Sequence, residues 1–292
     1  MIRRSPASVI RPDRQLTVPV VWCRLARMTD EATGRLLGRF VSAVEPVVPL
    51  VSVWAHGSLA GGDYRPGRSD LDLIAILGRP CTAAEERQLG EVHESLGRAI
   101  ALASGLHCSY CAAGELDDLA RVHLTWAHEE FMRRRVTPVT RRELHDFGLV
   151  LYGQAPAAVL PPVTGEQLAE FVVQDLESFW LPSLDHPELW DRDIWVDLGL
   201  LTLARATVTL RDGKLITKAR ALVRAYRARC PGRGCRGHQA APVRRPRSGL
   251  TAVDRPPGGA DAHLFAARDR TGPSALAALH RLIMLPMRAG AG

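Results

Sequence analysis

The residue types best suited to chemistry lie between positions 57 and 72, where Gly57-Ser58 is separated by an eleven-residue interval from Asp70-Leu71-Asp72. Aspartates two positions apart on a strand project from one face, so both carboxylates can share hard cations such as Mg²⁺. Such a cation can bridge phosphate oxygens and neutralise developing charge. The spacing predicts that Asp70 and Asp72 form a catalytic metal-binding pair. The alternative is a strand whose polar face is simply solvated.

The residues before the pair are suited to holding phosphate. Gly57 lets the backbone approach a phosphate closely, and the Ser58 hydroxyl and the amides at a following helix start can donate to its oxygens. Arg68, in the same interval, can pair with a triphosphate, although a solvated loop arginine fits equally well. Gly-Ser and Asp-x-Asp are each weak signals, but a strand, a Gly-Ser loop, a spacer and an Asp-x-Asp strand in that order are more specific. We predict Gly57, Ser58 and Arg68 as nucleotide-binding residues.

Hydrophobic periodicity predicts the elements that must position these residues. The pattern favours an α+β fold, with a small mixed sheet, flanking helices and a helical second domain. The expected strands are 50–55, 70–77 and 106–112, with a further short strand at 149–152, and the expected helices are 30–44, 89–103, 167–179 and 193–210.

Composition divides the chain into four parts. We expect a disordered N-terminal extension at 1–27, the domain with the sheet at 28–155, a helical domain at 163–225 that is truncated, and a disordered low-complexity tail at 226–292. The tail is rich in Arg, Pro and Gly and lacks the periodicity that a packed core requires. Its abrupt onset inside a helical pattern suggests a shifted reading frame.

Charge and hydropathy narrow the classes of partner. Residues 28–223 hold 27 acidic and 19 basic side chains, so the net charge of +7 comes from the two flanks, and only two of the 38 basic residues are lysine. This arginine bias indicates a GC-rich coding sequence more than a surface for polyanions, so nucleic acid is not expected as a partner. No apolar run approaches the ~20 residues of a membrane span. We expect a cytoplasmic protein without a membrane partner, with its six cysteines as reduced thiols.

Residues 50–112 resemble the nucleotidyltransferase superfamily related to DNA polymerase beta, whose motif is Gly-Ser followed by Asp-x-Asp on the next strand. In that family the aspartates bind two metal ions, and a third carboxylate on a later strand completes the site or acts as base. The segments LYGQAPAAVLPPV and DRDIWVDLGLLTLARATVTLRDGKLITKA look like the helical domain of streptomycin and spectinomycin adenylyltransferases. The resemblance therefore extends to about residue 223.

This resemblance implies a metal-dependent transfer of a nucleoside monophosphate, with two Mg²⁺ ions and ATP as co-substrate, to a hydroxyl of a small acceptor. An aminoglycoside acceptor, and hence antibiotic resistance, is the specific expectation. The family would place Lys218 near the triphosphate and an acidic helix near a cationic acceptor. Asp193 and Asp197, four positions apart, share a helix face as such binding requires, although a solvated face explains them equally. Trp190 is a candidate support for a sugar ring, with core packing as the alternative.

One position departs from the family pattern. Where relatives carry the third carboxylate, this chain has His107. A histidine, with an ordinary pKa near about 6.5, can accept a proton from a substrate hydroxyl, so His107 is a candidate catalytic base, with an ordinary strand histidine as the alternative. Glu115, Asp117 and Asp118 could supply the carboxylate if the strand register differs. A cluster at a helix start explains them equally.

Two other functions remain open from the sequence. The first is a non-catalytic nucleotide-binding relative of the family, which the histidine at position 107 and the aberrant tail would fit. The second is nucleotidylation of a protein or RNA, although the acidic central body argues mildly against RNA. No pattern in the sequence specifies the oligomeric state.

Overall fold

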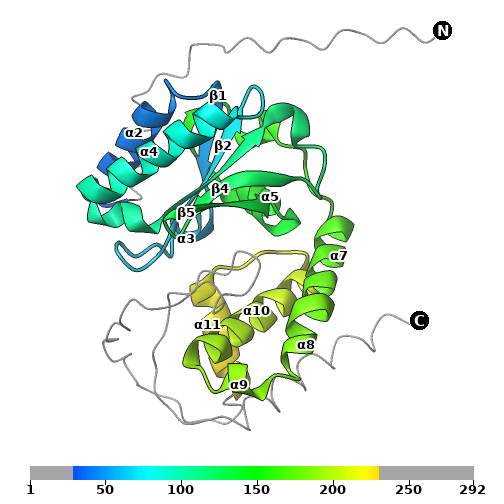
Figure 1. Cartoon of the computed structure of the whole chain (residues 1–292). Coiled ribbons are helices and arrows are strands. Elements are labelled where there is room, and N and C mark those ends of the chain that lie inside the picture. Colours follow the sequence, from blue (N-terminus) through cyan, green and yellow to red (C-terminus); the bar gives the residue numbers. More distant parts are fainter. Residues whose placement is uncertain (1–28, 230–292) are drawn as a thin grey trace, which may run out of the picture.

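A computed structural model describes residues 29–229 (Figure 1). The chain first forms a six-stranded mixed sheet with flanking helices and then a helical segment. The strand order is β5-β4-β3-β2-β1-β6, with β2 and β3 parallel and the other neighbours antiparallel. The strands are β1 Leu50–Ala55, β2 Leu71–Leu77, β3 Leu106–Ala112, β4 Val122–Ala127, β5 Glu130–Arg135 and β6 Leu149–Gly153. The predicted α+β class with flanking helices is confirmed. The extension predicted at 1–27 and the tail beyond residue 229 lie outside the described residues.

The helices fall into two groups. Those of the sheet layer are α2 Glu31–Val44, α3 Gly57–Gly61, α4 Ala83–Ala99, α5 Pro138–Phe147 and α6 Pro156–Val159, with 3-10 turns η1 Ala101–Gly105 and η2 Ala113–Glu115. The helical segment that follows contains α7 Gly165–Asp175, the π-helical turn η3 Leu176–Trp180, α8 Leu181–Ser183, α9 Pro187–Trp190, α10 Asp193–Asp212 and α11 Lys218–Arg229. In Figure 1 this segment lies below the sheet layer, connected to it through α7.

Helices α2 and α4 lie side by side across one face of the sheet (Figure 1). Both begin at residues with strong capping side chains: Asp30 accepts a hydrogen bond from the Thr33 amide, and Thr82 forms a capping box with Glu85. Their apolar sides bury Leu36, Phe40 and similar residues against one face of β2. This face is a closed hydrophobic core.

The opposite face of the sheet is only partly apolar. Because side chains alternate along a strand, Ile74 and Ile76 of β2 point away from α2 and α4, and they pack with Trp54 and with Leu144 of α5. Asp72 continues the same face toward the start of β2. Asp72, one of the two predicted metal-binding residues, therefore stands where the apolar cover of this face ends, and Asp70 lies just before the strand.

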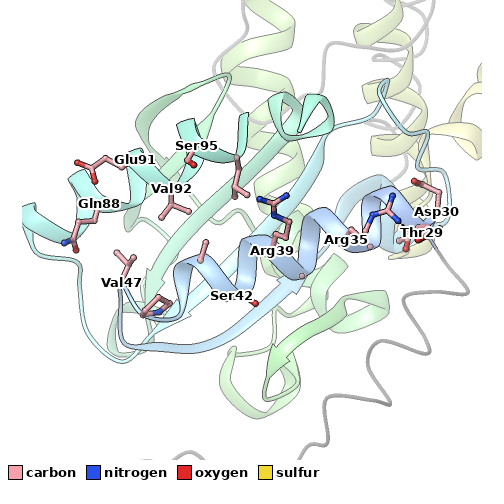
Figure 2. Close-up of a pocket in the computed structure, with 16 residues that line it drawn as sticks. Thr29, Asp30, Arg35, Arg39, Ser42, Val47, Gln88, Glu91, Val92 and Ser95 are labelled. Atoms are coloured by element: carbon pink, nitrogen blue, oxygen red, sulfur yellow. Dashed lines mark hydrogen bonds and ion pairs between the residues drawn. The ribbon is translucent and has the colours of Figure 1, made fainter. Parts of the chain in front are cut away.

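A groove of about 1290 Å³ runs between α2 and α4 on the outer side of their layer (Figure 2). Its lining comes from these two helices and their flanking turns, with charged groups at Asp30, Arg35, Arg39 and Glu91. The groove is thus separate from the face that carries Asp72. Among the described residues, no helix is long and apolar enough to cross a membrane.

Candidate active site

The turn between β1 and β2 presses its backbone against Asp72. The amide of His56 donates to the Asp72 carbonyl over 3.0 Å, which extends the ladder between the two strands to the start of the turn. Gly57 follows with a φ of +62°, and a Cβ at this position would lie 2.6 Å from Oδ2 of Asp72. Only glycine combines this backbone conformation with such a close approach. Gly57 and Asp72 are therefore in direct contact.

The rest of the turn is organised by local hydrogen bonds. The Ser69 hydroxyl accepts from the amide of Arg65 over 3.1 Å, which folds the chain back immediately before Asp70. Ser58 is half-buried in the short helix α3, whereas Arg68 is exposed. Ser58 is thus one residue from the glycine that contacts Asp72, and Arg68 lies in the loop that precedes Asp70.

Both predicted metal-binding aspartates have little exposure to solvent. Asp70, just before β2, is 7% exposed, and a Cβ on Gly105 would lie 3.8 Å from its Oδ1 atom. The Asp72 side chain is 15% exposed. Burying a charged carboxylate costs free energy unless a positive charge lies close by. A cation at this position would lower that cost.

His107 lies beside Asp72 on the neighbouring parallel strand. The register of β2 and β3 pairs the two residues, and Nδ1 of His107 is 3.6 Å from Oδ1 of Asp72. Glu115, Asp117 and Asp118 follow the far end of β3. At the usual rise of a strand, that end lies about 16 Å from His107. Glu115 there is paired with Arg121. The three acidic residues are therefore too distant to act as the third carboxylate, and the residue facing the pair is a histidine.

A second histidine, His128, contacts the first. The β4–β5 hairpin turns through His128 and Glu129, both with positive φ values of 57° and 65°. The ring of His128 packs edge-on against the ring of His107, with centroids 4.6 Å apart and planes at 76°. This hairpin is not predicted from the sequence, because its two-residue turn lacks the Asn-Gly or Asp-Gly pair that usually marks such turns.

Glu143 links the turn to the helical segment. Its Oε2 atom is 3.4 Å from Nδ1 of His56, and its Oε1 atom accepts from Arg205 of α10 over 2.8 Å. Burial acts to raise the pKa of Glu143, but the hydrogen bond from His56 and the charge of Arg205 outweigh it, so the pKa lies below its usual value. Glu143 is not predicted from the sequence either. Thr137 followed by Pro138 is a recognisable start for α5, the helix that contains Glu143, but it does not indicate what Glu143 contacts.

Lys218 lies at the first position of α11, beside the helix that contains Ser58. The next residue, Ala219, donates its amide to Oδ2 of Asp63 over 2.9 Å, and a Cβ on Gly61 would lie 3.3 Å from the Thr217 side chain. Figure 1 shows α3 at the edge of the sheet layer that faces α10 and α11. The structure thus packs the residues on both sides of Lys218 against Gly61 and Asp63, more than 150 positions earlier in the sequence.

The residues predicted to bind an acceptor lie farther along the helical segment. Asp193 is exposed in the first turn of α10 and Asp197 is half-buried one turn later. Asp193 lies about 18 Å along the helix axis from Arg205, where α10 contacts α5. Trp190 is 5% exposed, donates to the Ser183 carbonyl and packs with Trp180 and Trp195. Its position matches the core-packing alternative and leaves little of the ring open to a sugar.

The donor set around Asp72 fits a divalent cation. Within residues 29–229, no three histidine, cysteine, aspartate or glutamate side chains are grouped closely enough to hold a metal ion by themselves. Mg²⁺ is usually held by one or two carboxylates together with substrate phosphates and water, so it does not require such a cage. Asp72 with an imidazole nitrogen adjacent, and Asp70 two residues earlier, offer such a partial ligand set.

Comparisons with known proteins give a distant structural likeness. No protein-family model and no curated protein sequence matches the chain. A search of solved structures finds similarity to a spectinomycin adenyltransferase, AAD(9) from Enterococcus faecialis, in a crystal structure with ATP and spectinomycin. The match has 14% sequence identity and a TM-score of 0.49, and it covers 64% of this chain and 79% of the other.

Proposed function

We propose that this protein is a metal-dependent nucleotidyltransferase that moves a nucleoside monophosphate, with ATP as the donor, to a hydroxyl of a small cationic acceptor such as an aminoglycoside. The observation that supports it best is the contact between Gly57 and Asp72, in which a Cβ would come within 2.6 Å of the carboxylate. This close contact is what the proposed motif requires. In that motif the Gly57 backbone and the Ser58 hydroxyl would bind phosphate on one side, and Asp70 and Asp72 would bind metal on the other.

In the proposed reaction, the acceptor oxygen forms a bond to the α-phosphorus, the bond from that phosphorus to the bridging oxygen breaks, and pyrophosphate leaves. Asp70 and Asp72 would hold the divalent cations, which when bound offset the negative charge on the phosphates. Ser58 would donate to a phosphate oxygen, and Lys218, beside the α3 turn, would bind the triphosphate as a point charge. The sequence suggests His107 as the base that takes the acceptor proton, but its Nδ1 atom faces Asp72 and its Nε2 atom is buried, so we assign this proton to solvent.

The acceptor would bind between the sheet layer and the helical segment. Glu143–Arg205 and Asp63–Ala219 join these two parts on either side of the Gly57 turn. An acceptor with several amines would find acidic side chains at Asp193 and Asp197 of α10, which suits a cationic substrate. This choice of acceptor rests on the resemblance of the helical segment and on these charges.

The test is pyrophosphate release from labelled nucleoside triphosphates with a panel of aminoglycosides and other hydroxylated amines, in the presence of divalent cations. We expect release that needs both metal and acceptor and that is lost in Asp72→Ala. Asp117→Ala, an exposed aspartate beyond the far end of β3, is the matched control and should keep full activity. Activity that survives Asp72→Ala would overturn the proposal. Nucleotide binding without release would indicate the non-catalytic alternative.

A further inference from the structure

The two histidines next to Asp72 suggest how the metal site differs from a purely carboxylate one. We propose that Asp72 and His107 ligate one divalent cation together, with His128 as a positioning residue, so that the site favours first-row transition ions such as Mn²⁺ over Mg²⁺. This inference deepens the proposed function and rests on it, because it concerns the cation that Asp70 and Asp72 would hold.

The distance between the two side chains suits a shared ion. Two ligands that each lie about 2.1 Å from one ion are about 3.0 to 3.5 Å apart, depending on the coordination angle. Nδ1 of His107 and Oδ1 of Asp72 are 3.6 Å apart, longer than a hydrogen bond. A small side-chain movement would therefore let both atoms reach one cation.

The orientation of His107 favours a ligand over a proton acceptor. Its Nδ1 atom is the ring nitrogen that faces Asp72, and its Nε2 atom is buried. A general base must lie within hydrogen-bond reach of the hydroxyl that it deprotonates. Neither nitrogen meets this requirement easily, because one faces the carboxylate and the other is enclosed by protein.

The hairpin turn holds the His107 ring in this orientation. His128 and Glu129 both adopt the left-handed backbone region, which is unfavourable for non-glycine residues and persists where the surroundings impose it. The turn places the ring of His128 edge-on at 4.6 Å from that of His107. Packing against His128 restricts rotation of the His107 ring. We therefore assign His128 a positioning role, with His107 as the metal ligand.

An imidazole nitrogen changes the preference of the site. Mg²⁺ is a hard cation that favours oxygen ligands, whereas the affinity of nitrogen-containing sites rises along the first transition row from Mn²⁺ onward. Replacing a carboxylate by a neutral imidazole also removes one negative charge. Both changes weaken Mg²⁺ more than they weaken a transition ion.

The experiment uses Mn²⁺ with inorganic pyrophosphate, which supplies phosphate oxygens but contains no nitrogen. Electron spin-echo modulation of the full-length protein should show ¹⁴N coupled to the bound Mn²⁺, and the signal should vanish in His107→Asp and His107→Asn. We expect His107→Asp to lower the ratio of Mn²⁺ to Mg²⁺ affinity about tenfold. His128→Gln should weaken Mn²⁺ binding a few-fold and alter the ¹⁴N signal, whereas His186→Gln, an exposed histidine of the helical segment, should change neither.

Absence of ¹⁴N coupling in the wild-type protein, which requires no variant to fold, would overturn the inference, as would coupling that persists without His107. An unchanged signal in His128→Gln would refute the positioning role. These results are independent of the activity assay. A nitrogen-ligated ion in a protein that releases no pyrophosphate would refute only the proposed function, and Asp72-dependent release without ¹⁴N coupling would refute only the inference.

Discussion

The two faces of the sheet each hold a buried histidine, and the two histidines have opposite surroundings. On the α4 face, His93 stacks on Trp126 at 4.7 Å and hydrogen-bonds to the Tyr110 hydroxyl over 2.7 Å. Burial, together with the nearby His107, lowers the pKa of His93 to about 3, so it stays neutral. On the other face, His107 lies beside a carboxylate. One face satisfies its polar atoms with a neutral partner, whereas the other gathers ionisable groups, the usual mark of a site selected for function over stability.

The sharpest test of this contrast compares adjacent residues that point to opposite faces. We expect Asp72→Asn to reduce nucleotidyl transfer by about a thousandfold or more and to change the free energy of unfolding by less than about 1 kcal/mol. Leu73→Ala, on the α4 face, should lower the free energy of unfolding by about 2 to 5 kcal/mol. Pyrophosphate release and urea denaturation measure the two effects. If Asp72→Asn destabilised the protein as much as Leu73→Ala, the contrast between the faces would be wrong.

A second pair of variants separates backbone strain from contact with the site. Gly57 and Gly62 both have positive φ values, +62° and +81°, but a Cβ on Gly62 would meet nothing within 4 Å. Gly62→Ala should therefore lower the free energy of unfolding by about 1 kcal/mol through backbone strain alone, and Gly57→Ala should lower it further because of the clash with Asp72. Only Gly57→Ala should also displace Asp72, and so weaken Mn²⁺ binding measured by electron paramagnetic resonance. Equal metal affinity in the two variants would show that the Gly57 contact does not shape the site.

The remaining prediction concerns the link to the helical segment. Because the pKa of Glu143 is lower in the folded protein, its ionised form stabilises the fold above the ordinary pKa near 4.5, and this contribution is lost as the pH falls. Glu143→Gln should lower the free energy of unfolding by about 1.5 to 3 kcal/mol at pH 7, and the difference from wild type should shrink below about pH 4.5. Denaturation between pH 3 and 7 measures it. Glu166→Gln, exposed on α7, should show no such trend, and a constant difference for Glu143→Gln would contradict the assignment.

The sequence predicted the elements with strong hydrophobic periodicity. The strands at 50–55 and 106–112 coincide with β1 and β3, and the expected strand at 70–77 differs from β2 by one residue. The hairpin β4–β5 was missed because Glu130–Arg135 is dense in charge and only half covered, and its turn uses His-Glu instead of glycine. Edge strands of this kind depend on pairing with the sheet, which no local pattern records.

The site was predictable only in part for a related reason. Asp70 and Asp72 lie close together in the sequence, so the prediction that they share a face needs strand geometry alone, and it stays a prediction because β2 begins at Leu71. Glu143 and His128 reach the same region from α5 and from the β4–β5 turn, and their positions depend on packing between distant segments. The relation of His107 to Asp72 is intermediate, because it requires the parallel register of β2 and β3. Long-range contacts, not residue chemistry, set the limit.

The tryptophan cluster of the helical segment has a consequence for spectroscopy. Trp180, Trp190 and Trp195 account for three of the six tryptophans in the chain, and their rings lie within 6.5 Å of one another. Rings this close exchange excitation energy and report as one chromophore, with blue-shifted emission because all three are buried. A shift of that emission to longer wavelength would therefore report loosening of the helical segment, while Trp54 and Trp126 remain enclosed in the sheet layer.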